Sequence, residues 1–432
     1  MDALKTVDPL RADVTDEGGR GGDGTTASGA GGDPTGTATP TDDPEERLFS
    51  GPTGRLLLAA SVGWAAIQCG RLVLSPMLPS VMADLGIGEF EAGVAFTVMW
   101  GLYALLQYPS GRLSDRLSRP SLLVPGLALV SVGFLLLSRA QSYPPYLLGA
   151  AVVGVGAGLY PTAARALVSD LFVRRRGQAF GLHTASGDLG GAAAAGLAVV
   201  VLGAATWRSA YAPVVAVLAV VLLALHRWRR EPYEWRRVPL GVRETLVRLF
   251  GQRRMATLVG AYVLYAFTWQ GAVGFLPTFL QRTKGFSPGF AGGGFAALFV
   301  VGAAVKPVSG WLGDRLAKPL VAAGGLVLGA TALAGTLLVE GSVAVSVGVV
   351  GFAAGLMAFP PAMQAFLMDV FPDGSMGGDL GAARSVYIGL GSLGPTYVGF
   401  VAGWAGYGPA FAGLAVCLVV SAAAVLGLGL TR

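Results

Sequence analysis

The chain has 432 residues, of which 53% are hydrophobic and 13% are charged, and its mean hydropathy is +0.62. A soluble domain cannot keep so much apolar surface in water, so the composition excludes a single large soluble core. The net charge of +6 is unevenly distributed, because residues 1–50 contain 11 acidic and 4 basic residues whereas the remainder contains 14 and 27.

The acidic N-terminal region, residues 1–50, is rich in Gly, Thr, Asp and Pro, with almost no large apolar residue between Glu17 and Pro44. Such a segment buries too little surface to offset the entropy cost of ordering, so we expect a disordered tail. It lacks the basic start and apolar core of a secretory signal, and we expect it to be retained in the cytoplasm.

Apolar runs of about 20 residues follow, each long enough to cross the hydrocarbon layer of a bilayer as a helix. The first set of six covers residues 55–79, 90–110, 120–138, 144–169, 178–203 and 209–226. The second set covers residues 256–280, 290–310, 319–339, 343–368, 380–403 and 407–430. The predicted fold is all-α and integral to the membrane, with twelve transmembrane helices in two bundles, residues 51–226 and 255–432.

The segment between the two sets, residues 227–254, is strongly basic, with nine Arg against three Glu. Basic loops stay on the cytoplasmic side of a membrane, so we expect this linker and both termini inside the cell, with the protein in the plasma membrane. Nucleic-acid binding is the alternative for a basic loop, but beside a membrane the ordinary meaning of this pattern is topological.

The two halves are related by an internal repeat at an offset of 199 residues. Gly-Arg-Leu-Ser-Asp-Arg-Leu-Ser-Arg-Pro at 111–120 recurs as Gly-Trp-Leu-Gly-Asp-Arg-Leu-Ala-Lys-Pro at 310–319, and Asp170 recurs as Asp369. The halves therefore run in the same direction as parallel repeats, an arrangement that places a substrate site between two rocking bundles.

The repeated decamer resembles the signature of the major facilitator superfamily, found between helices 2 and 3 and between helices 8 and 9. The resemblance implies alternating access and a conformational latch, formed here by Gly111, Asp115, Arg116, Gly310, Asp314, Arg315, Asp170 and Asp369. The glycines allow tight helix ends, and the carboxylates of Asp115 and Asp314 can hold helix N-termini or arginines. The alternative is that these charges only fix topology.

Arg71 lies inside the first predicted span, sixteen residues beyond Arg55. Polar residues recur around it at spacings of 3 and 4, which draws a stripe along one helix face, formed by Ser61, Trp64, Gln68, Arg71 and Ser75. An arginine inside a membrane is costly, so the stripe predicts a functional cavity. The alternative is that Arg71 snorkels to the outer headgroups.

Arg165 is a second arginine within a span, and its alternative role is to snorkel to the inner interface beside Asp170. The repeat relates Arg71 to Gln270 and Arg165 to Gln364, so each arginine has an amide as its counterpart. A guanidinium group binds carboxylate or phosphate through two parallel hydrogen bonds, and amides can complete such a shell. The predicted ligand is therefore a small anion.

Aromatic residues of the seventh span, Tyr262 and Trp269, are expected to wall the same site, or else only to pack between helices. The predicted substrate-binding residues are Arg71, Arg165, Gln270, Gln364, Gln68, Trp64, Tyr262 and Trp269. At residues 69–79 and 160–165 the sequence is similar to the anion:cation symporter branch, which pairs an arginine in helix 1 with one in helix 4. That branch often has an acid before the first arginine, where this chain has Gly70.

Asp188 is the only carboxylate within a span well away from a predicted helix end. With His183 in the same span it is the predicted coupling residue, carrying a proton or a sodium ion. The alternatives are that Asp188 pairs with Arg384 or another arginine, and that His183 only forms local hydrogen bonds. Lys306, at the inner end of the eighth span, is expected to snorkel.

No phosphate-binding loop, metal-ligand cluster or nucleophile constellation is present in the sequence, so we expect neither an enzyme, nor an ATP-driven pump, nor a cofactor. The leading hypothesis is secondary transport of a small organic or inorganic anion by symport with H⁺ or Na⁺, in a monomer. One alternative is an exporter of cationic or amphipathic compounds, which would need an acid near its pocket. Another is a transporter-like receptor that binds its solute without moving it.

Overall fold

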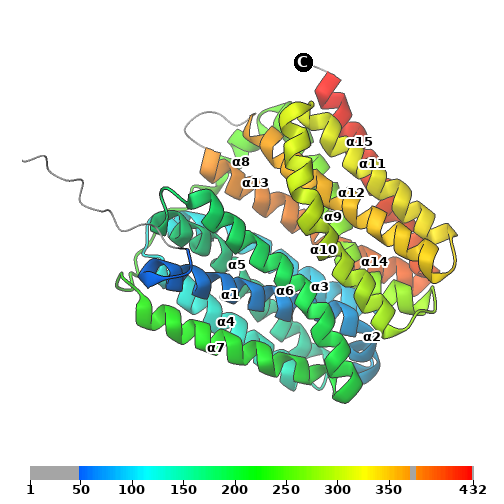
Figure 1. Ribbon diagram of the computed structural model, residues 1–432, viewed down its shortest axis with the longest axis horizontal. Coiled ribbons are helices and arrows are strands. Elements are labelled where there is room, and N and C mark those ends of the chain that lie inside the picture. The colour runs from blue at the N-terminus through cyan, green and yellow to red at the C-terminus, as the bar shows by residue number, and fades with distance from the viewer. Residues whose placement is uncertain (1–47, 370–375, 431–432) are drawn as a thin grey trace, which may run out of the picture. The chain divides into compact units, whose positions relative to one another are not determined.

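The computed structural model describes residues 48–369 and 376–430, and every regular element in these ranges is a helix (Figure 1). The predicted disordered tail, residues 1–50, falls almost wholly outside them. Residues 46–432 form one compact unit, which contains all the helices. The twelve predicted spans are confirmed, because twelve helical segments of the described chain are long and apolar enough to cross a membrane.

The first bundle contains the helices that precede the basic linker. They are α1 (Gly51–Leu72), α2 (Leu74–Leu85), α3 (Glu89–Ser114), α4 (Pro120–Arg139), α5 (Tyr143–Leu171), α6 (Arg176–Ala204), the short 3₁₀ helix η1 (Trp207–Ala210) and α7 (Tyr211–Trp228). A short helix, α8 (Val242–Phe250), lies within the linker.

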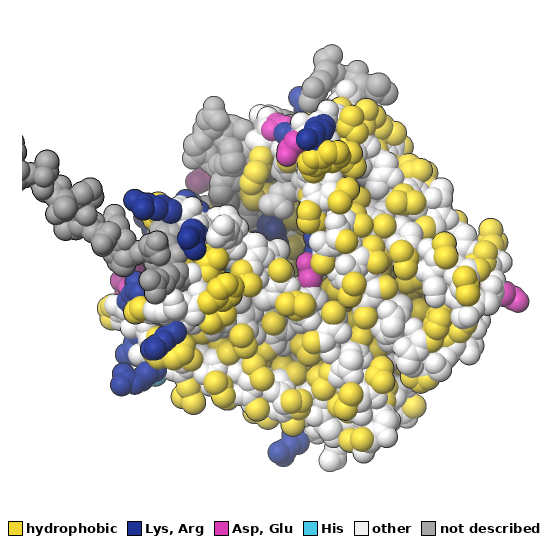
Figure 2. All heavy atoms as spheres, viewed as in Figure 1, with side chains coloured by type: hydrophobic (Ala, Val, Ile, Leu, Met, Phe, Trp, Pro, Cys, Tyr) yellow, Lys and Arg dark blue, Asp and Glu magenta, His cyan; other side chains and the backbone are white. Residues whose placement is uncertain are grey.

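The second bundle follows with the same number of spans. Its helices are α9 (Arg253–Arg282), α10 (Pro288–Arg315), α11 (Lys318–Leu338), α12 (Ser342–Met368), α13 (Met376–Gly391), α14 (Leu393–Ala405) and α15 (Tyr407–Leu430). On the face shown in Figure 2, hydrophobic and uncharged side chains cover most of the surface, as expected for helices that contact lipid.

Two spans are broken in the middle, which the hydropathy pattern did not predict. The first span breaks between α1 and α2 at Val73, and the eleventh breaks between α13 and α14 at Ser392. A proline follows each break, Pro76 after the first and Pro395 after the second. Proline has no N–H for the helix ladder and its ring crowds the carbonyl four residues earlier, which explains why the helix is interrupted just before it.

The internal repeat is visible in the side-chain contacts as well as in the helix count. Ser110 on α3 donates its hydroxyl to the carbonyl of Leu159 on α5 at 2.8 Å. Adding the repeat offset gives Ser309 on α10 and Ala358 on α12, and the same hydrogen bond is present there. The two halves therefore pack equivalent helices in equivalent ways, which confirms the prediction of parallel repeats.

The bundles are in contact at the end opposite the linker, which we call the far side. Ser75 on α2 donates its hydroxyl to the carbonyl of Gly274 on α9 at 3.1 Å, and the hydroxyls of Thr97 on α3 and Thr396 on α14 lie 2.7 Å apart. Arg282 forms an ion pair with Glu89 near the same end. The end that carries the linker, which we call the linker side, contains the central cavity instead.

Candidate central transport site

A cavity of about 740 Å³ lies between the two bundles and opens toward the linker side. Helices α1, α3, α5 and α6 of the first bundle and α12 and α13 of the second contribute its lining. Four of the predicted substrate-binding and coupling residues are in this lining, namely Trp64, Arg165, His183 and Gln364. The structure therefore brings together side chains from both repeats, as the sequence predicted, although not the same set.

Two arginines dominate the charge of this cavity, Arg165 on α5 and Arg384 on α13. Arg165 donates its Nε to the carbonyl of Pro161 at 3.0 Å, one turn back on its own helix. The Nε of Arg384 is buried without a hydrogen-bond partner among the described residues. No acidic residue lines the cavity in the described ranges. The arrangement is therefore strongly electropositive and suited to an anion.

Arg384 was absent from the predicted site, because its place four residues inside the eleventh span was taken only as a possible partner for Asp188. A usable signal was present in the sequence. Leu380, Gly381 and Arg384 are spaced as one face of a helix, and all three line the cavity.

An aromatic stack borders the cavity near Arg165. Trp64 on α1 stacks against Tyr160 with ring centroids 6.5 Å apart, and against His183 on α6 at the same separation. The Nδ1 of His183 is buried without a partner in the described part of the chain, so it can meet a solute or a proton. The stack fixes the position of both side chains at the cavity wall.

Arg71 lies outside the cavity lining and is almost fully buried, with 1% of its surface exposed. Its guanidinium carbon is 4.1 Å from the ring centroid of Trp100 and 4.3 Å from that of Tyr103, and its Nη1 donates to Gln68 at 3.2 Å. Its Nε and Nη2 have no partner in the described chain. Tyr103 lines the cavity, so Arg71 lies directly behind this ring rather than facing Arg165 across open space.

Four further residues of the predicted substrate set also lie outside the lining, and one of them, Gln68, accepts the hydrogen bond from Arg71. Gln270 donates its Nε2 to the carbonyl of Ile388 at 3.0 Å. Tyr262 stacks on Tyr387 with centroids 4.3 Å apart, and Trp269 packs edge-on against Phe299. In this conformation these contacts hold the second bundle together, so a role in binding stays a prediction.

Asp188 makes an ion pair that joins the two bundles. Both of its carboxylate oxygens accept hydrogen bonds from the Nζ of Lys306 on α10, each at 2.8 Å. The expectation that Lys306 snorkels to the interface was therefore wrong, and so was the alternative that an arginine is the partner of Asp188. Hydropathy could not reveal the pair, because the two residues are far apart in sequence and meet only through the crossing of α6 and α10.

The repeated signature forms a matching ion pair in each half. Arg119, just before α4, donates its Nε to Asp170 near the end of α5 at 2.8 Å. Lys318, at the start of α11, donates to Asp369 after α12 at 2.6 Å. Adding the repeat offset of 199 to Arg119 and Asp170 gives Lys318 and Asp369, so the same basic and acidic partners meet in each half. The suggested contact between Arg165 and Asp170 is therefore replaced by Arg119 and Asp170.

The carboxylates inside the decamers behave differently. Asp115 and Asp314 are exposed and form no ion pair with the described residues, in contrast to the expected contacts with arginines or helix N-termini. Arg315 packs over the ring of Trp311 at 3.8 Å. Because the bundles are apart on the linker side, a partner from the opposite bundle would come within reach only after that side closes.

The remaining predicted latch residues of the decamers make no hydrogen bond or ion pair with the opposite bundle among the described residues. Gly111 lines the central cavity, whereas a side chain at Gly310 would meet nothing within 4 Å. The carbonyl of Arg116 accepts a hydrogen bond from Arg236 of the linker. In this conformation Arg116 therefore contacts the linker and not the opposite bundle.

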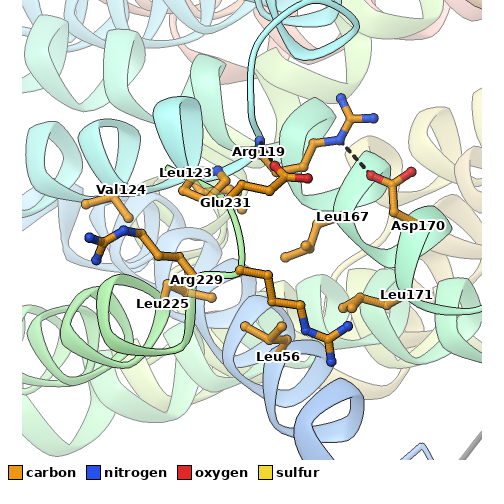
Figure 3. A pocket seen from close by; sticks show the side chains of 12 residues that line it. Leu56, Arg119, Leu123, Val124, Leu167, Asp170, Leu171, Leu225, Arg229 and Glu231 are labelled. Carbon is orange, nitrogen blue, oxygen red and sulfur yellow. Dashed lines mark hydrogen bonds and ion pairs between the residues drawn. The ribbon is translucent and has the colours of Figure 1, made fainter. Parts of the chain in front are cut away.

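A smaller pocket of about 210 Å³ lies beside the Arg119–Asp170 pair (Figure 3). Apolar side chains, including Leu56 and Leu167, form much of its lining. Glu231 of the linker accepts a hydrogen bond from the backbone N–H of Arg119 at 3.2 Å. The linker is thereby tied to the start of α4.

Comparison with known proteins assigns the family. The family profile described as Major Facilitator Superfamily matches residues 60–395 and 258–431. The chain belongs to this superfamily. Members of the major facilitator superfamily are transporters, and the twelve-helix fold with its repeated decamer agrees with that assignment.

Individual relatives are distant. The chain is 25% identical over 265 residues to the "Probable sulfoacetate transporter SauU" of Cupriavidus necator, covering 57% of this chain and 62% of that one. It is 28% identical over 218 residues to "Multidrug resistance protein MdtL" of Escherichia fergusonii, covering 49% and 54%. The matches thus span less than two thirds of these relatives.

A solved structure, a bacterial homolog of the human lysosomal transporter Spinster in an inward-facing and occupied conformation, aligns with a TM-score of 0.75. It covers 89% of this chain and 98% of that one at 18% identity. At this identity the likeness concerns the fold alone.

Proposed function

We propose that this major facilitator transporter moves a small organic or inorganic anion across the cytoplasmic membrane by alternating access. The observation that carries the proposal is the pair of arginines, Arg165 and Arg384, in a cavity without an acidic lining residue in the described ranges. Positive charge inside a membrane protein is costly unless an opposite charge offsets it, so such a cavity has a functional reason to retain its arginines. The similarity to a sulfoacetate transporter supports the same class of solute.

The same proposal gives the orientation of the protein. The linker side carries the nine Arg of residues 227–254, so it faces the cytoplasm and both termini lie inside. The cavity then opens inward, while contacts such as Ser75 with Gly274 close the outward side. Transport requires these far-side contacts to break as the linker side closes, which is the rocking motion of two parallel repeats.

The Asp188–Lys306 pair is the proposed coupling element for symport with H⁺ or Na⁺. A proton on Asp188 would remove the charge that holds Lys306 and loosen α6 from α10. A sodium ion would have to displace an ammonium group that already contacts both carboxylate oxygens. The geometry therefore favours H⁺ over Na⁺ as the coupling ion.

Flux measurements in proteoliposomes test the anion proposal. Arg165→Gln and Arg384→Gln should each reduce anion uptake at least about tenfold, because a charge-assisted hydrogen bond contributes roughly 1.5–3 kcal/mol. Arg139→Gln is the matched control, since Arg139 is an exposed arginine at the end of α4 away from the cavity. Uptake that survives in both cavity variants at the control level would refute the proposal.

Export of cationic or amphipathic compounds is the second candidate, favoured by the similarity to a multidrug resistance protein. The aromatic rings of Trp64, Tyr103 and Phe180 in the cavity would suit such compounds. The two arginines oppose a cationic solute by direct repulsion. Binding of a cationic dye that carboxylates do not displace, together with dye efflux from proteoliposomes, would favour the exporter.

A further inference from the structure

Two arginines from opposite bundles face the same cavity, Arg165 from α5 and Arg384 from α13. Neither makes an ion pair with a carboxylate of the described chain. Both side chains line this one cavity, so their positive charges repel each other. The described lining contains no acidic residue, so the two arginines give the cavity two positive charges that no lining side chain balances.

We infer that the transported solute is a divalent anion, whose two charges are shared between Arg165 and Arg384. The inference rests on the proposed function and adds the charge of the solute to it. A monovalent anion neutralises one guanidinium group and leaves the other without a counter-charge, which is unfavourable once the cavity closes and excludes water. A divalent anion pairs with both groups and removes the repulsion between them.

The rest of the lining sets the size and polarity of this solute. Neutral hydrogen-bonding side chains, Gln107, Thr162 and Gln364, lie beside the arginines, and Trp64 contributes an aromatic wall. A cavity of about 740 Å³ exceeds the size of a single oxyanion. A short organic molecule with two carboxylates, or with a carboxylate and a sulfonate, fits these features best, while a divalent oxyanion would use part of the space.

Charge sharing also gives the solute a role in the transport cycle. Because Arg165 and Arg384 line the cavity from opposite bundles, repulsion between them favours separation of the bundles on the linker side while the cavity is empty. A divalent anion between them replaces repulsion with attraction from both sides. Binding therefore favours closure of the linker side, and a monovalent anion lacks one half of this attraction.

The test compares anions that differ by one charge, using the purified full-length protein. The pairs are succinate with succinamate, sulfoacetate with sulfoacetamide, and sulfate with nitrate. Binding is measured as thermal stabilisation against concentration at constant ionic strength, because salt screens the charges being compared. At least one divalent member should bind about tenfold to hundredfold more tightly than its monovalent partner, the difference expected for one set of charge-assisted hydrogen bonds.

Variants connect this preference to the two arginines. Arg165→Gln and Arg384→Gln should each lower the preference for the divalent member to near unity, because one positive charge remains. Arg384→Lys should keep part of it, since lysine retains the charge without the bidentate fork. Arg139→Gln should leave it unchanged, because Arg139 is remote from the cavity.

The outcomes separate this inference from the proposed function. Wild-type protein that binds a monovalent member as tightly as its divalent partner overturns the divalent solute but not anion transport. A preference that survives in both glutamine variants also overturns it. If no anion of any pair stabilises the wild-type protein, the proposed function fails together with the inference. The pair that shows the preference identifies the solute as a dicarboxylate, a sulfonated acid or an inorganic oxyanion.

Discussion

The ammonium group of Lys306 contacts both carboxylate oxygens of Asp188 at 2.8 Å, and this ion pair connects α6 of one bundle to α10 of the other. Farther along the same helices, a side chain at Gly191 would clash with Phe299, so α6 and α10 are in close contact there. The ion pair lies one turn of α6 away from Thr184, which lines the cavity. A charge change at Asp188 would alter the contact between the bundles directly.

Neutralising Asp188 is therefore expected to uncouple transport from the proton gradient. Asp188→Asn should abolish accumulation of the solute against its gradient while preserving exchange across the membrane, because exchange needs no net movement of the coupling ion. The loss of uphill uptake should be at least about tenfold, the effect of removing roughly 1.4 kcal/mol of coupling free energy. Parallel assays of uphill uptake and of exchange in proteoliposomes measure this difference.

Lys306→Gln provides the complementary variant. It leaves Asp188 without its cation, so both variants should lose coupling by opposite changes of charge. Uphill uptake at the wild-type level in Asp188→Asn would exclude this residue from coupling and return attention to His183.

The two ion pairs related by the repeat, Arg119 with Asp170 and Lys318 with Asp369, are predicted to contribute little to stability. Their aspartates are about half exposed, with 51% and 48% of the side-chain surface accessible. Exposed pairs typically contribute about 1 kcal/mol or less. Asp170→Asn and Asp369→Asn should therefore leave the melting temperature nearly unchanged while slowing transport, as measured by thermal unfolding and by initial uptake rates. A large loss of stability in either variant would instead assign the pair a structural role.

The sequence predicted the helices better than it predicted the site. Helix number and the repeat follow from hydropathy and self-similarity, which are local or periodic signals. Which residues line the cavity depends on how each helix is rotated about its own axis. Hydropathy and residue spacing do not determine that rotation. Arg165 and Gln364 were predicted and do line the cavity, whereas Arg71 and Gln270 lie behind it.

Arg384 is the converse case, because it lines the cavity but was not among the predicted site residues. The sequence suggested Arg384 only as a possible partner of Asp188, and it is the packing of α13 against α3 that places it at the cavity. Ion pairs between bundles, such as Asp188 with Lys306, were equally invisible because no repeat relation connects the two residues.

Replacing Arg71 is expected to affect transport without lowering the stability of the fold. Its guanidinium is buried with two unpaired nitrogens and no carboxylate partner among the described residues, so the cost of burying the charge offsets the favourable contacts with Trp100 and Tyr103. Arg71→Met should keep or slightly raise the melting temperature, because an apolar side chain removes the cost of burying a charge. Transport should nevertheless fall at least about tenfold if Arg71 contacts the solute once the far side opens. Arg71→Met with wild-type transport would remove Arg71 from the substrate site.

Closure of the far side depends on glycine at position 93. A Cβ added there would lie 2.4 Å from the carbonyl oxygen of Pro395 on the opposite bundle, a backbone atom that cannot move aside as a flexible side chain could. Gly93→Ala should therefore disfavour the conformation with a closed far side by about 1–3 kcal/mol, the usual cost of overpacking. This corresponds to a shift of about fivefold to somewhat more than a hundredfold toward the conformation that is open on the far side.

The shift between the two conformations can be measured as the accessibility of a cavity residue to a reagent on the linker side. In a background where Cys69 and Cys417 are replaced, Ser169→Cys places a thiol in the cavity lining, and a membrane-impermeant maleimide applied from the linker side measures its exposure. Gly93→Ala should slow this labelling, because closing the linker side accompanies opening of the far side. Gly196→Ala is the matched control, since a side chain at Gly196 meets nothing within 4 Å. Equal labelling rates in the two variants would mean that α3 and α14 separate without regard to this contact, and the far-side closure would then have to depend on the hydroxyl contacts of Ser75 and Thr97 instead.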